Sequence, residues 1–347
     1  MKTAKYVLLP VLAIMLLCCC ALDSKQVEQP VLQPENVEQG SKRVLTMAIE
    51  NELSQNAVTA ADYFADKIES ISEGRLLIEK VYCDDLLAQL DSGCDIVFGS
   101  NAEFARANGD FLIYSSPFYF AGYNHLTMTL NSPQFNIVTK NSNVNLLKAT
   151  PIGAFYDGAY YIVSSRKEMY DTVDQYNGKM INVLGGQPLF EEILESLGAN
   201  IKERDEQYML ENFGKNRNIS AMECEISLLS SITKDEKVES FHICKSFHRA
   251  KINWMMLSET ARSSMTPYEM AVITEAAAYA IAKNDSIVVE KEDASFEAAK
   301  NMGGIITALN QSEFSYIAET VLKNSAKYVS LWDWSVYGEV KNIAFEK

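Results

Sequence analysis

Residues Tyr176–Asn200 read YNGKMINVLGGQPLFEEILESLGAN, and this stretch is the most informative about the fold. A β-rich run is followed by Gly185-Gly186 and then by an amphipathic segment. Pro188 stands at the first helical position, which needs no backbone N–H, and Gly198 stands just past the end, where helices favour glycine. The stretch therefore predicts a strand, a turn and a helix.

The same alternation of strands and helices begins near the N-terminus. Val44–Ile49, Arg75–Tyr82 and Cys94–Phe98 are β-rich runs. Between the first two, Ser54–Ser72 carries apolar residues at the spacing of one helical face. Strand, helix and strand in this order indicate a parallel sheet with crossover helices, so we predict an α/β protein.

Two later helices have recognisable starts. Thr266–Glu269 has the form of a capping box with proline in the first turn, and it predicts a helix that runs to about Lys283. Asn310 opens another helix. In the last segment, the alternation in WDWSVYG, which contains Trp332 and Trp334, predicts an edge strand. We expect that segment to pack onto the protein body rather than to serve as a partner site.

Residues 1–20 have the pattern of an export signal. Two lysines precede an apolar run that ends near Leu17 and is too short to span a bilayer comfortably. Leu17 stands three residues before Cys20, a spacing similar to that of a bacterial lipoprotein signal. We expect Cys20 to be acylated, with Cys19 as the second choice. The alternative is an ordinary cleaved signal with chance cysteines.

Composition limits the partners of the chain. Residues 21–43 are rich in Gln, Glu and Pro and poor in large apolar groups, so we expect a disordered linker. The 347 residues include 48% hydrophobic ones, enough for one large domain or two lobes. Their formal net charge is −15, which would repel nucleic acid, so no nucleic-acid partner is expected.

Several motifs resemble those of the solute-binding proteins of tripartite ATP-independent periplasmic (TRAP) transporters. In the stretch quoted first, the shared residues are Gly178, Lys179, Ile181, Val183 and Leu197-Gly198-Ala199. FADKIESISEGRLLIEKVY (64–82) and YSSPFYFAGYNH (114–125) are similar to two further family segments. The resemblance covers roughly residues 44–323.

The resemblance implies an α/β, two-lobed periplasmic-binding-protein (Venus-flytrap) fold with hinge strands and a spanning helix. The ligand would lie in the cleft between the lobes. The implied divisions are 44–150 plus 239–284 for lobe I, 151–238 plus 285–323 for lobe II, and 324–347 for a C-terminal tail.

Three family positions that usually hold the ligand's carboxylate differ in this chain. By resemblance, Tyr160 and Asn182 stand in place of arginines, and Cys224 stands in place of an asparagine. Losing one partner of a buried charged pair costs ~2–5 kcal/mol, and neither Tyr nor Asn replaces an arginine's charge. We therefore expect uncharged cleft walls and a small neutral or apolar organic ligand. The expected lining is Phe118, Tyr156, Tyr160 and Met222.

Three polar residues are further candidates for the ligand site. Arg204 precedes a segment that resembles a pocket-lining one, so it is either a relocated anionic anchor or a solvated surface residue. Asn51 and Glu52 follow the first strand, at the edge of the sheet where α/β clefts bind ligands. A plain turn explains those two residues equally well.

Enzymatic functions find little support in the sequence. The histidines are His125, His242 and His248, and their spacing favours surface or hydrogen-bonded structural roles. No serine or cysteine lies in a nucleophile motif, and the cysteines lack metal-ligand spacing, so no catalytic residue, metal or cofactor is expected. A disulfide between Cys83 and Cys94 is not expected, because these strand ends lie at opposite edges of a parallel sheet.

The resemblance implies an extracytoplasmic solute-binding lipoprotein of a TRAP-type secondary importer. Such a protein delivers its small-molecule ligand to small and large integral membrane subunits. We expect it to be periplasmic or extracytoplasmic and lipid-anchored to a bacterial membrane. The alternative is a binding-protein fold reused as a surface lipoprotein for protein–protein interaction, with a vestigial cleft.

Overall fold

The computed structural model describes residues 42–132, 147–165, 168–215, 219–232 and 241–343. The residues from Lys42 onward form one compact unit. The predicted signal with Cys19 and Cys20, and the predicted linker up to Ser41, lie outside the described residues. Within the described ranges, each helix is too short or too polar to cross a bilayer.

The described strands form one nine-stranded sheet in the order β2-β1-β3-β8-β4-β7-β5-β6, with β9 paired to β8. Pairing is parallel for β1 with β2 and β3, and for β5 with β6 and β7, which confirms the predicted α/β class. The strands are β1 (Arg43–Glu50), β2 (Leu76–Cys83), β3 (Ile96–Ser100), β4 (Ala149–Ser164), β5 (Met180–Leu184), β6 (Asn200–Arg204), β7 (Ala221–Glu225), β8 (His242–Ser258) and β9 (Ile305–Ala308).

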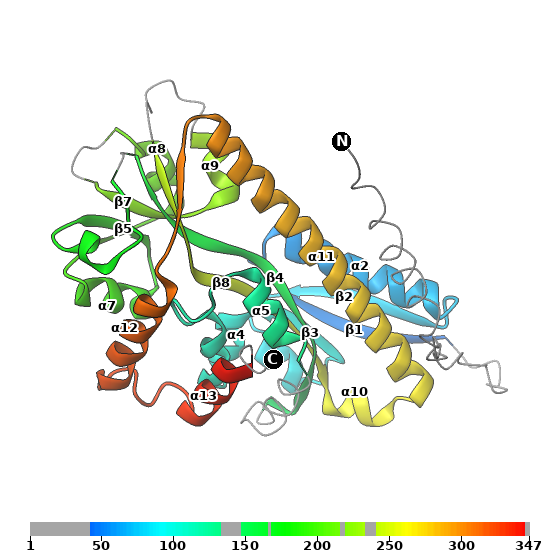
Figure 1. Ribbon diagram of the computed structural model, residues 1–347. Helices are drawn as coiled ribbons and strands as arrows, with labels where there is room; N and C mark the ends of the chain where they lie inside the picture. The colour runs from blue at the N-terminus through cyan, green and yellow to red at the C-terminus, as the bar shows by residue number, and fades with distance from the viewer. Residues whose placement is uncertain (1–41, 133–146, 166–167, 216–218, 233–240, 344–347) are drawn as a thin grey trace, which may run out of the picture. The chain divides into compact units, whose positions relative to one another are not determined.

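Helices accompany both halves of this sheet (Figure 1). The predicted strand–turn–helix at Tyr176–Asn200 is confirmed as β5 and α7, and Gly198 has the positive φ of 80° that its position predicts. The helices are α2 (Gln55–Ile71), α3 (Leu86–Asp91), α4 (Asn101–Ala105), α5 (Tyr123–Leu130), α7 (Pro188–Ser196), α8 (Glu206–Asn212), α9 (Ile226–Ile232), α10 (Glu259–Ser264), α11 (Pro267–Asn301), α12 (Gln311–Asn324) and α13 (Trp334–Ile343), with 3-10 turns η1 (Gly109–Ser115) and η3 (Val173–Tyr176).

Two long antiparallel strands, β4 and β8, join the halves of the sheet. Residues Asn253–Leu257 of β8 pair with β3 on one side, and Tyr160–Val163 of β4 pair with β7 on the other. The β4–β8 register shifts between Tyr156 and Ala159, where Gly158 adopts a φ of 103° that favours glycine. An irregularity in the middle of two crossing strands suits them to act as a hinge.

A single helix of 35 residues, α11, contacts α2, β4 and α9 and so reaches both halves (Figure 1). Its capping box is present, because the Thr266 hydroxyl accepts from the Glu269 N–H and the Glu269 carboxylate accepts from the Thr266 N–H. The predicted end near Lys283 is wrong, since the helix continues to Asn301. The second half keeps a buried stripe that includes Val288, Glu292, Phe296 and Ala299.

The predicted edge strand in WDWSVYG is also wrong, because the segment enters helix α13. The buried residues Val336, Tyr337, Val340 and Ile343 follow helical spacing. The expected packing onto the body is confirmed, since the Tyr119 O–H donates to the Tyr337 carbonyl at 2.7 Å. A short alternating pattern could not distinguish the two structures.

The four described cysteines, at positions 83, 94, 224 and 244, are free thiols. Cys224 is buried in the core, and burial raises the pKa of its thiol far above the ordinary value. A thiol with a raised pKa is a poor nucleophile.

Candidate functional site

A cavity of about 460 Å³ lies where segments from both halves of the sheet meet. Its walls come from the turn before α2, from β3, α4 and η1, from the start of α7, from the middle of β8, and from the C-terminal segment at Tyr328 and Leu331. The volume lies within the range of roughly 300–1,000 Å³ that is usual for small-molecule sites. The cavity is therefore the strongest candidate for the ligand site.

Strand β8 contributes the charged part of the wall. Arg249, Lys251 and Asn253 all line the cavity and alternate along the strand, so they share one face of it. The expectation of uncharged cleft walls is therefore wrong. Asp157 of β4 and the exposed Glu52 add carboxylates to the same cavity.

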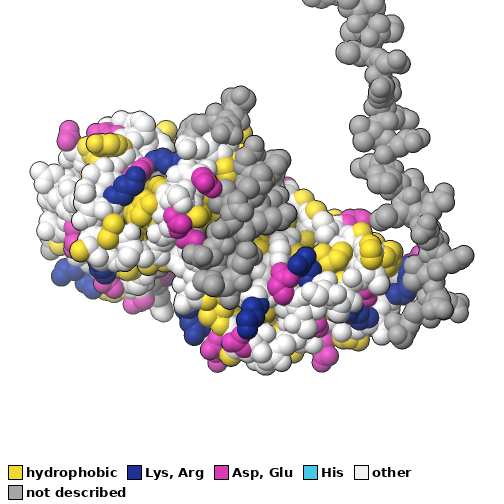
Figure 2. All heavy atoms as spheres, turned by 90° about the horizontal axis from the view of Figure 1, so that it is seen from below, with side chains coloured by type: hydrophobic (Ala, Val, Ile, Leu, Met, Phe, Trp, Pro, Cys, Tyr) yellow, Lys and Arg dark blue, Asp and Glu magenta, His cyan; other side chains and the backbone are white. Residues whose placement is uncertain are grey.

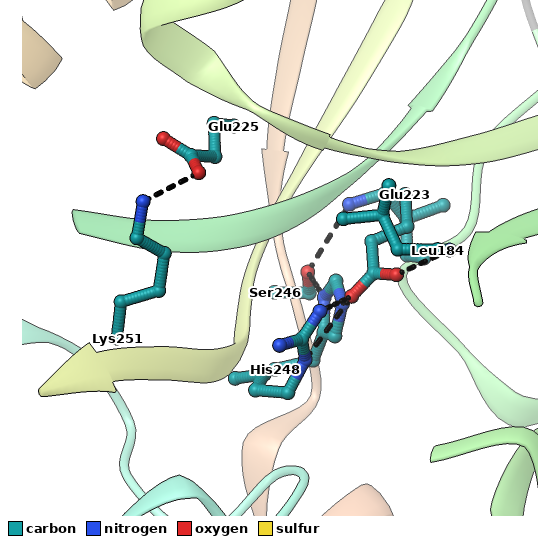
Figure 3. Close-up of polar contacts among 8 residues, drawn as sticks. Leu184, Glu223, Glu225, Ser246, His248 and Lys251 are labelled. Carbon is teal, nitrogen blue, oxygen red and sulfur yellow. Dashed lines mark hydrogen bonds and ion pairs between the residues drawn. The ribbon is translucent and has the colours of Figure 1, made fainter. Parts of the chain in front are cut away.

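Arg249 is held by a fully buried carboxylate. Its Nη2 donates to Glu223 Oε1 at 2.7 Å and its Nε to the same oxygen at 3.3 Å. The other oxygen of Glu223 accepts from the Leu184 N–H at 3.0 Å (Figure 3). Burial raises the pKa of Glu223, but the charge of Arg249 and the bonds from His248 and Leu184 outweigh it and lower the pKa to about 2.

His248 completes this cluster. Its Nε2 lies 3.2 Å from Glu223 Oε1 and its Nδ1 lies 2.8 Å from Ser246 Oγ (Figure 3). Burial lowers the pKa of His248, so the neutral ring donates from Nε2 to the carboxylate and accepts at Nδ1. The ring also stacks on Phe190, with 4.2 Å between centroids. His248 is thus a hydrogen-bonded structural residue, as predicted.

Lys251 is paired with two carboxylates. Its Nζ lies 2.6 Å from Glu225 and 3.6 Å from Asp157, and the latter accepts a 2.5 Å bond from the Ser54 hydroxyl. Burial lowers the pKa of Lys251, but Asp157 and Glu225 outweigh this effect and raise it. Both cations in the wall therefore carry their counter-charges within the protein.

Of the ligand-site residues predicted from the sequence, some line the cavity and others do not. Glu52 lines it, while Asn51 is exposed and donates to Asp84 Oδ1 at 2.5 Å. Tyr160 is not in the lining, but its ring lies under the guanidinium of Arg249, with 4.0 Å from the guanidinium carbon to the ring centroid.

Four other expected residues, Phe118, Tyr156, Met222 and Cys224, are buried in the core and do not line the cavity. Asn182 is also buried, and together with Met222 it lines a separate cavity of about 10 Å³. A space of that volume holds about one water molecule, so it cannot accept an organic ligand.

Arg204 lies apart from the cavity. It borders an open surface hollow with Glu203 and Asp205, and its guanidinium carbon is 4.9 Å from the ring centroid of Tyr208. Its Nη1 donates to the Glu203 carbonyl at 2.9 Å. This placement separates Arg204 from the cations that line the cavity.

Sequence reasoning missed Arg249, Lys251 and Asn253. Their signal was present in the run RAKIN (249–253), where polar residues alternate within a long, mostly apolar strand. When polar residues occur at every second position of such a strand, they share one face. That face either lines a cavity or takes part in ion pairs. Glu223 gave no comparable signal, because its role depends on contacts with β8.

Neither the face shown in Figure 2 nor the metal-ligating side chains of the described residues offers a competing site. On the face shown in Figure 2, Lys and Arg side chains are interspersed with Asp and Glu rather than gathered into a basic patch. Within the described ranges, no group of three or more His, Cys, Asp or Glu side chains is arranged to hold a metal ion.

Comparisons with known proteins agree on one family. Residues 47–328 match the family described as bacterial extracellular solute-binding protein, family 7. No curated protein matches the chain.

Solved structures with the same fold are numerous. The ectoine-binding protein TeaA of the TeaABC TRAP transporter, in its apo state, has a TM-score of 0.73 at 14% identity and covers 87% of this chain and 99% of its own. A TRAP solute-binding protein from Ochrobactrum anthropi has a TM-score of 0.70 at 15% identity, with 88% and 97% covered. One from Ralstonia eutropha with bound (S)-2-acetolactate has a TM-score of 0.64 at 15% identity, with 88% and 99% covered. These likenesses confirm the expected periplasmic-binding-protein fold.

Proposed function

The chain belongs to the TRAP periplasmic solute-binding proteins of extracellular solute-binding family 7, and on that premise we propose that it binds a small net-neutral organic solute in the cavity of about 460 Å³. Members of this family are binding proteins rather than enzymes, and the chain is the solute-binding component of a TRAP transporter.

Internal charge pairing carries this proposal. Arg249 is neutralised by Glu223, and Lys251 by Glu225 and Asp157, before any ligand arrives. A carboxylate ligand would have to compete with these carboxylates for the same cations, in a wall that already contains Glu52. A neutral or zwitterionic solute avoids that competition.

Apolar side chains form the rest of the wall. Leu53, Leu112, Leu189, Phe190 and Ile252 line the cavity alongside the charged residues. A solute with an apolar portion would gain roughly 25 cal/mol for each Å² of apolar surface that it buries there. We therefore expect an organic solute in which an apolar part and a polar part lie at different ends.

Native mass spectrometry of the purified full-length protein tests the proposal. We expect a co-purified solute at one copy per protein, with a net charge of zero at pH 7. Titration calorimetry with succinate supplies the opposite test, since submicromolar binding of this dicarboxylate would contradict the proposal. A wild-type protein that repeatedly purifies empty, and that binds no candidate solute, would favour the protein-interaction function instead.

The domain limits and the membrane anchor remain parts of the proposal. Lobe I would comprise 44–150 plus 239–284, lobe II 151–238 plus 285–323, and the tail 324–347, so that α11 and the start of β4 cross between the lobes while β8 belongs to lobe I. The small and large integral TRAP subunits would be its membrane partners. Acylation at Cys20, or at Cys19, would hold the periplasmic protein on a membrane.

A further inference from the structure

Asn253 presents a hydrogen-bond donor that the protein does not use. The residue lies in β8, paired with Ser100 of β3 and Phe155 of β4, and it lines the cavity while being only 4% exposed. Its Nδ2 is buried and has no hydrogen-bond partner among the described residues. Buried amide groups without a partner are rare in folded proteins, so this one calls for an explanation.

In the same wall the side chain of Asn101 is satisfied, whereas the buried Tyr328 hydroxyl is a second group without a hydrogen-bond partner among the described residues. The Nδ2 of Asn101 donates to the Phe111 carbonyl at 2.5 Å and to Ser115 Oγ at 2.9 Å. Its Oδ1 accepts from Trp254 Nε1 at 2.7 Å. The two asparagines have similar burial, but the Nδ2 of Asn101 has acceptors within the protein and the Nδ2 of Asn253 has none among the described residues.

Asn253 lines the cavity, so an acceptor that enters the cavity and meets the amide as its side chain turns is the partner considered for Nδ2. A carboxylate there would be buried and would need a cation, but Lys251 and Arg249 on the same face of β8 are already paired with Glu225, Asp157 and Glu223. An uncharged oxygen has no such requirement. A carbonyl, amide or hydroxyl oxygen of a solute therefore matches both the donor and the charge of the wall.

We propose that Asn253 determines ligand specificity by donating from Nδ2 to an uncharged carbonyl, amide or hydroxyl oxygen of the bound solute. This inference rests on the proposed function and narrows it from a net-neutral solute to one that carries such an oxygen. A solute that lacks the oxygen would leave the amide unpaired, and sites built around a buried donor discriminate strongly against such analogues.

The test uses the solute released from denatured wild-type protein, identified by mass spectrometry and NMR and then added back to stripped protein. Titration calorimetry compares the wild type with Asn253→Leu, Asn253→Asp and the control Asn301→Leu, which changes an exposed asparagine at the end of α11. We expect Asn253→Leu to weaken binding about 5- to 150-fold. We expect Asn253→Asp, which has the same size, to weaken it at least as much, and the control to bind like the wild type.

Melting curves of the stripped proteins give a second readout. If Nδ2 is unpaired without solute, the melting temperature of Asn253→Leu is no lower than that of the wild type. A clearly lower melting temperature would show that the amide is already satisfied by the protein and would overturn the inference. Binding by Asn253→Leu within twofold of the wild type, or a solute without a carbonyl, amide or hydroxyl oxygen, would also overturn it. If Asn253→Leu does not fold, the same twofold limit applies to Asn253→Asp.

Failure of the inference differs from failure of the proposed function. A wild-type protein that binds its co-purified solute tightly, with no dependence on position 253, refutes the role of Asn253 alone. A wild-type protein that carries and binds no solute refutes both.

Discussion

Arg249 lies directly opposite Tyr160 across the β4–β8 ladder, and its guanidinium carbon is 4.0 Å from the centroid of the tyrosine ring. Tyr160 is the position where the family resemblance leads one to expect an arginine. In this chain the Tyr160 ring stabilises the Arg249 guanidinium by a cation–π contact. Glu223 neutralises the same guanidinium, so Arg249 has both a ring and a carboxylate of the protein as partners.

Removing Arg249 should strongly destabilise the protein. Arg249→Met leaves the fully buried Glu223 carboxylate without its cation, and breaking a buried pair in this way costs roughly 3–5 kcal/mol. Urea unfolding at pH 7 measures the loss. The matched control is Arg262→Met, which breaks the exposed pair with Glu259 and should cost about 0–1 kcal/mol.

A double variant shows whether Glu223 is the cause. Adding Glu223→Gln to Arg249→Met removes the stranded charge, so the pair of changes should cost less than the sum of the two single changes. Strict additivity of the free energies of unfolding would show that Arg249 stabilises the fold by packing rather than by its charge.

Glu292 should make stability depend on pH. It fastens α11 to the hinge region of β4 by accepting from the Tyr156 O–H at 2.7 Å and the Ala159 N–H at 3.0 Å. Burial raises the pKa of Glu292 from the ordinary 4.5 to about 7, despite the hydrogen bonds that lower it. Between these values the folded protein binds the proton and the unfolded chain does not, so the contribution of Glu292 to stability falls as the pH rises.

The glutamine variant isolates this effect. Urea unfolding at pH 5 and pH 7.5 should show that the free energy of unfolding of the wild type falls by about 2 kcal/mol more over this range than that of Glu292→Gln. Burial lowers the pKa of His242 and His248, which gives slopes of the opposite sign, but both proteins share those histidines. Identical pH dependence of the two proteins would mean that Glu292 stays ionised throughout.

Substitution of Gly109 should displace the C-terminal wall of the cavity. A Cβ at Gly109 would lie 1.7 Å from the Leu331 carbonyl oxygen, so Gly109→Ala must push that segment away. We expect the free energy of unfolding of Gly109→Ala to fall by about 1–3 kcal/mol, and proteolysis near Leu331 to be faster. Gly338→Ala is the control, because nothing lies within 4 Å of its added Cβ, and in helix α13 it should stabilise by ~0.5–1 kcal/mol. Equal melting temperatures for wild type and Gly109→Ala would refute the close contact.

The lipid anchor can be tested by two adjacent serine substitutions. Cys20→Ser should abolish incorporation of labelled palmitate and release the protein from the membrane fraction, since acyl chains supply the anchor. Cys19→Ser should leave both properties unchanged. The reverse result would assign the acylated position to Cys19, and labelling of neither site in the wild type would indicate an ordinary cleaved signal.

Sequence alone determined the order of the elements, because the signals act over a few residues. Pro188 and Gly198 bounded α7, and Thr266 with Glu269 fixed the start of α11. The same short range explains the failure at the C-terminal segment. Seven alternating residues fit a strand or a helix, and the contact between Tyr119 and Tyr337, 218 residues apart, accompanies the helix.

Only the tertiary structure decided the charge of the cavity. Tyr160, Glu223 and Arg249 lie on β4, β7 and β8, and they meet because the sheet places β4 between the other two strands. Local backbone preferences specify each strand but not its neighbours. Strand order and register determine which side chains pair. The sequence therefore predicted a protein with a cleft, but only the fold showed that carboxylates of the same protein neutralise the cations in the cavity wall.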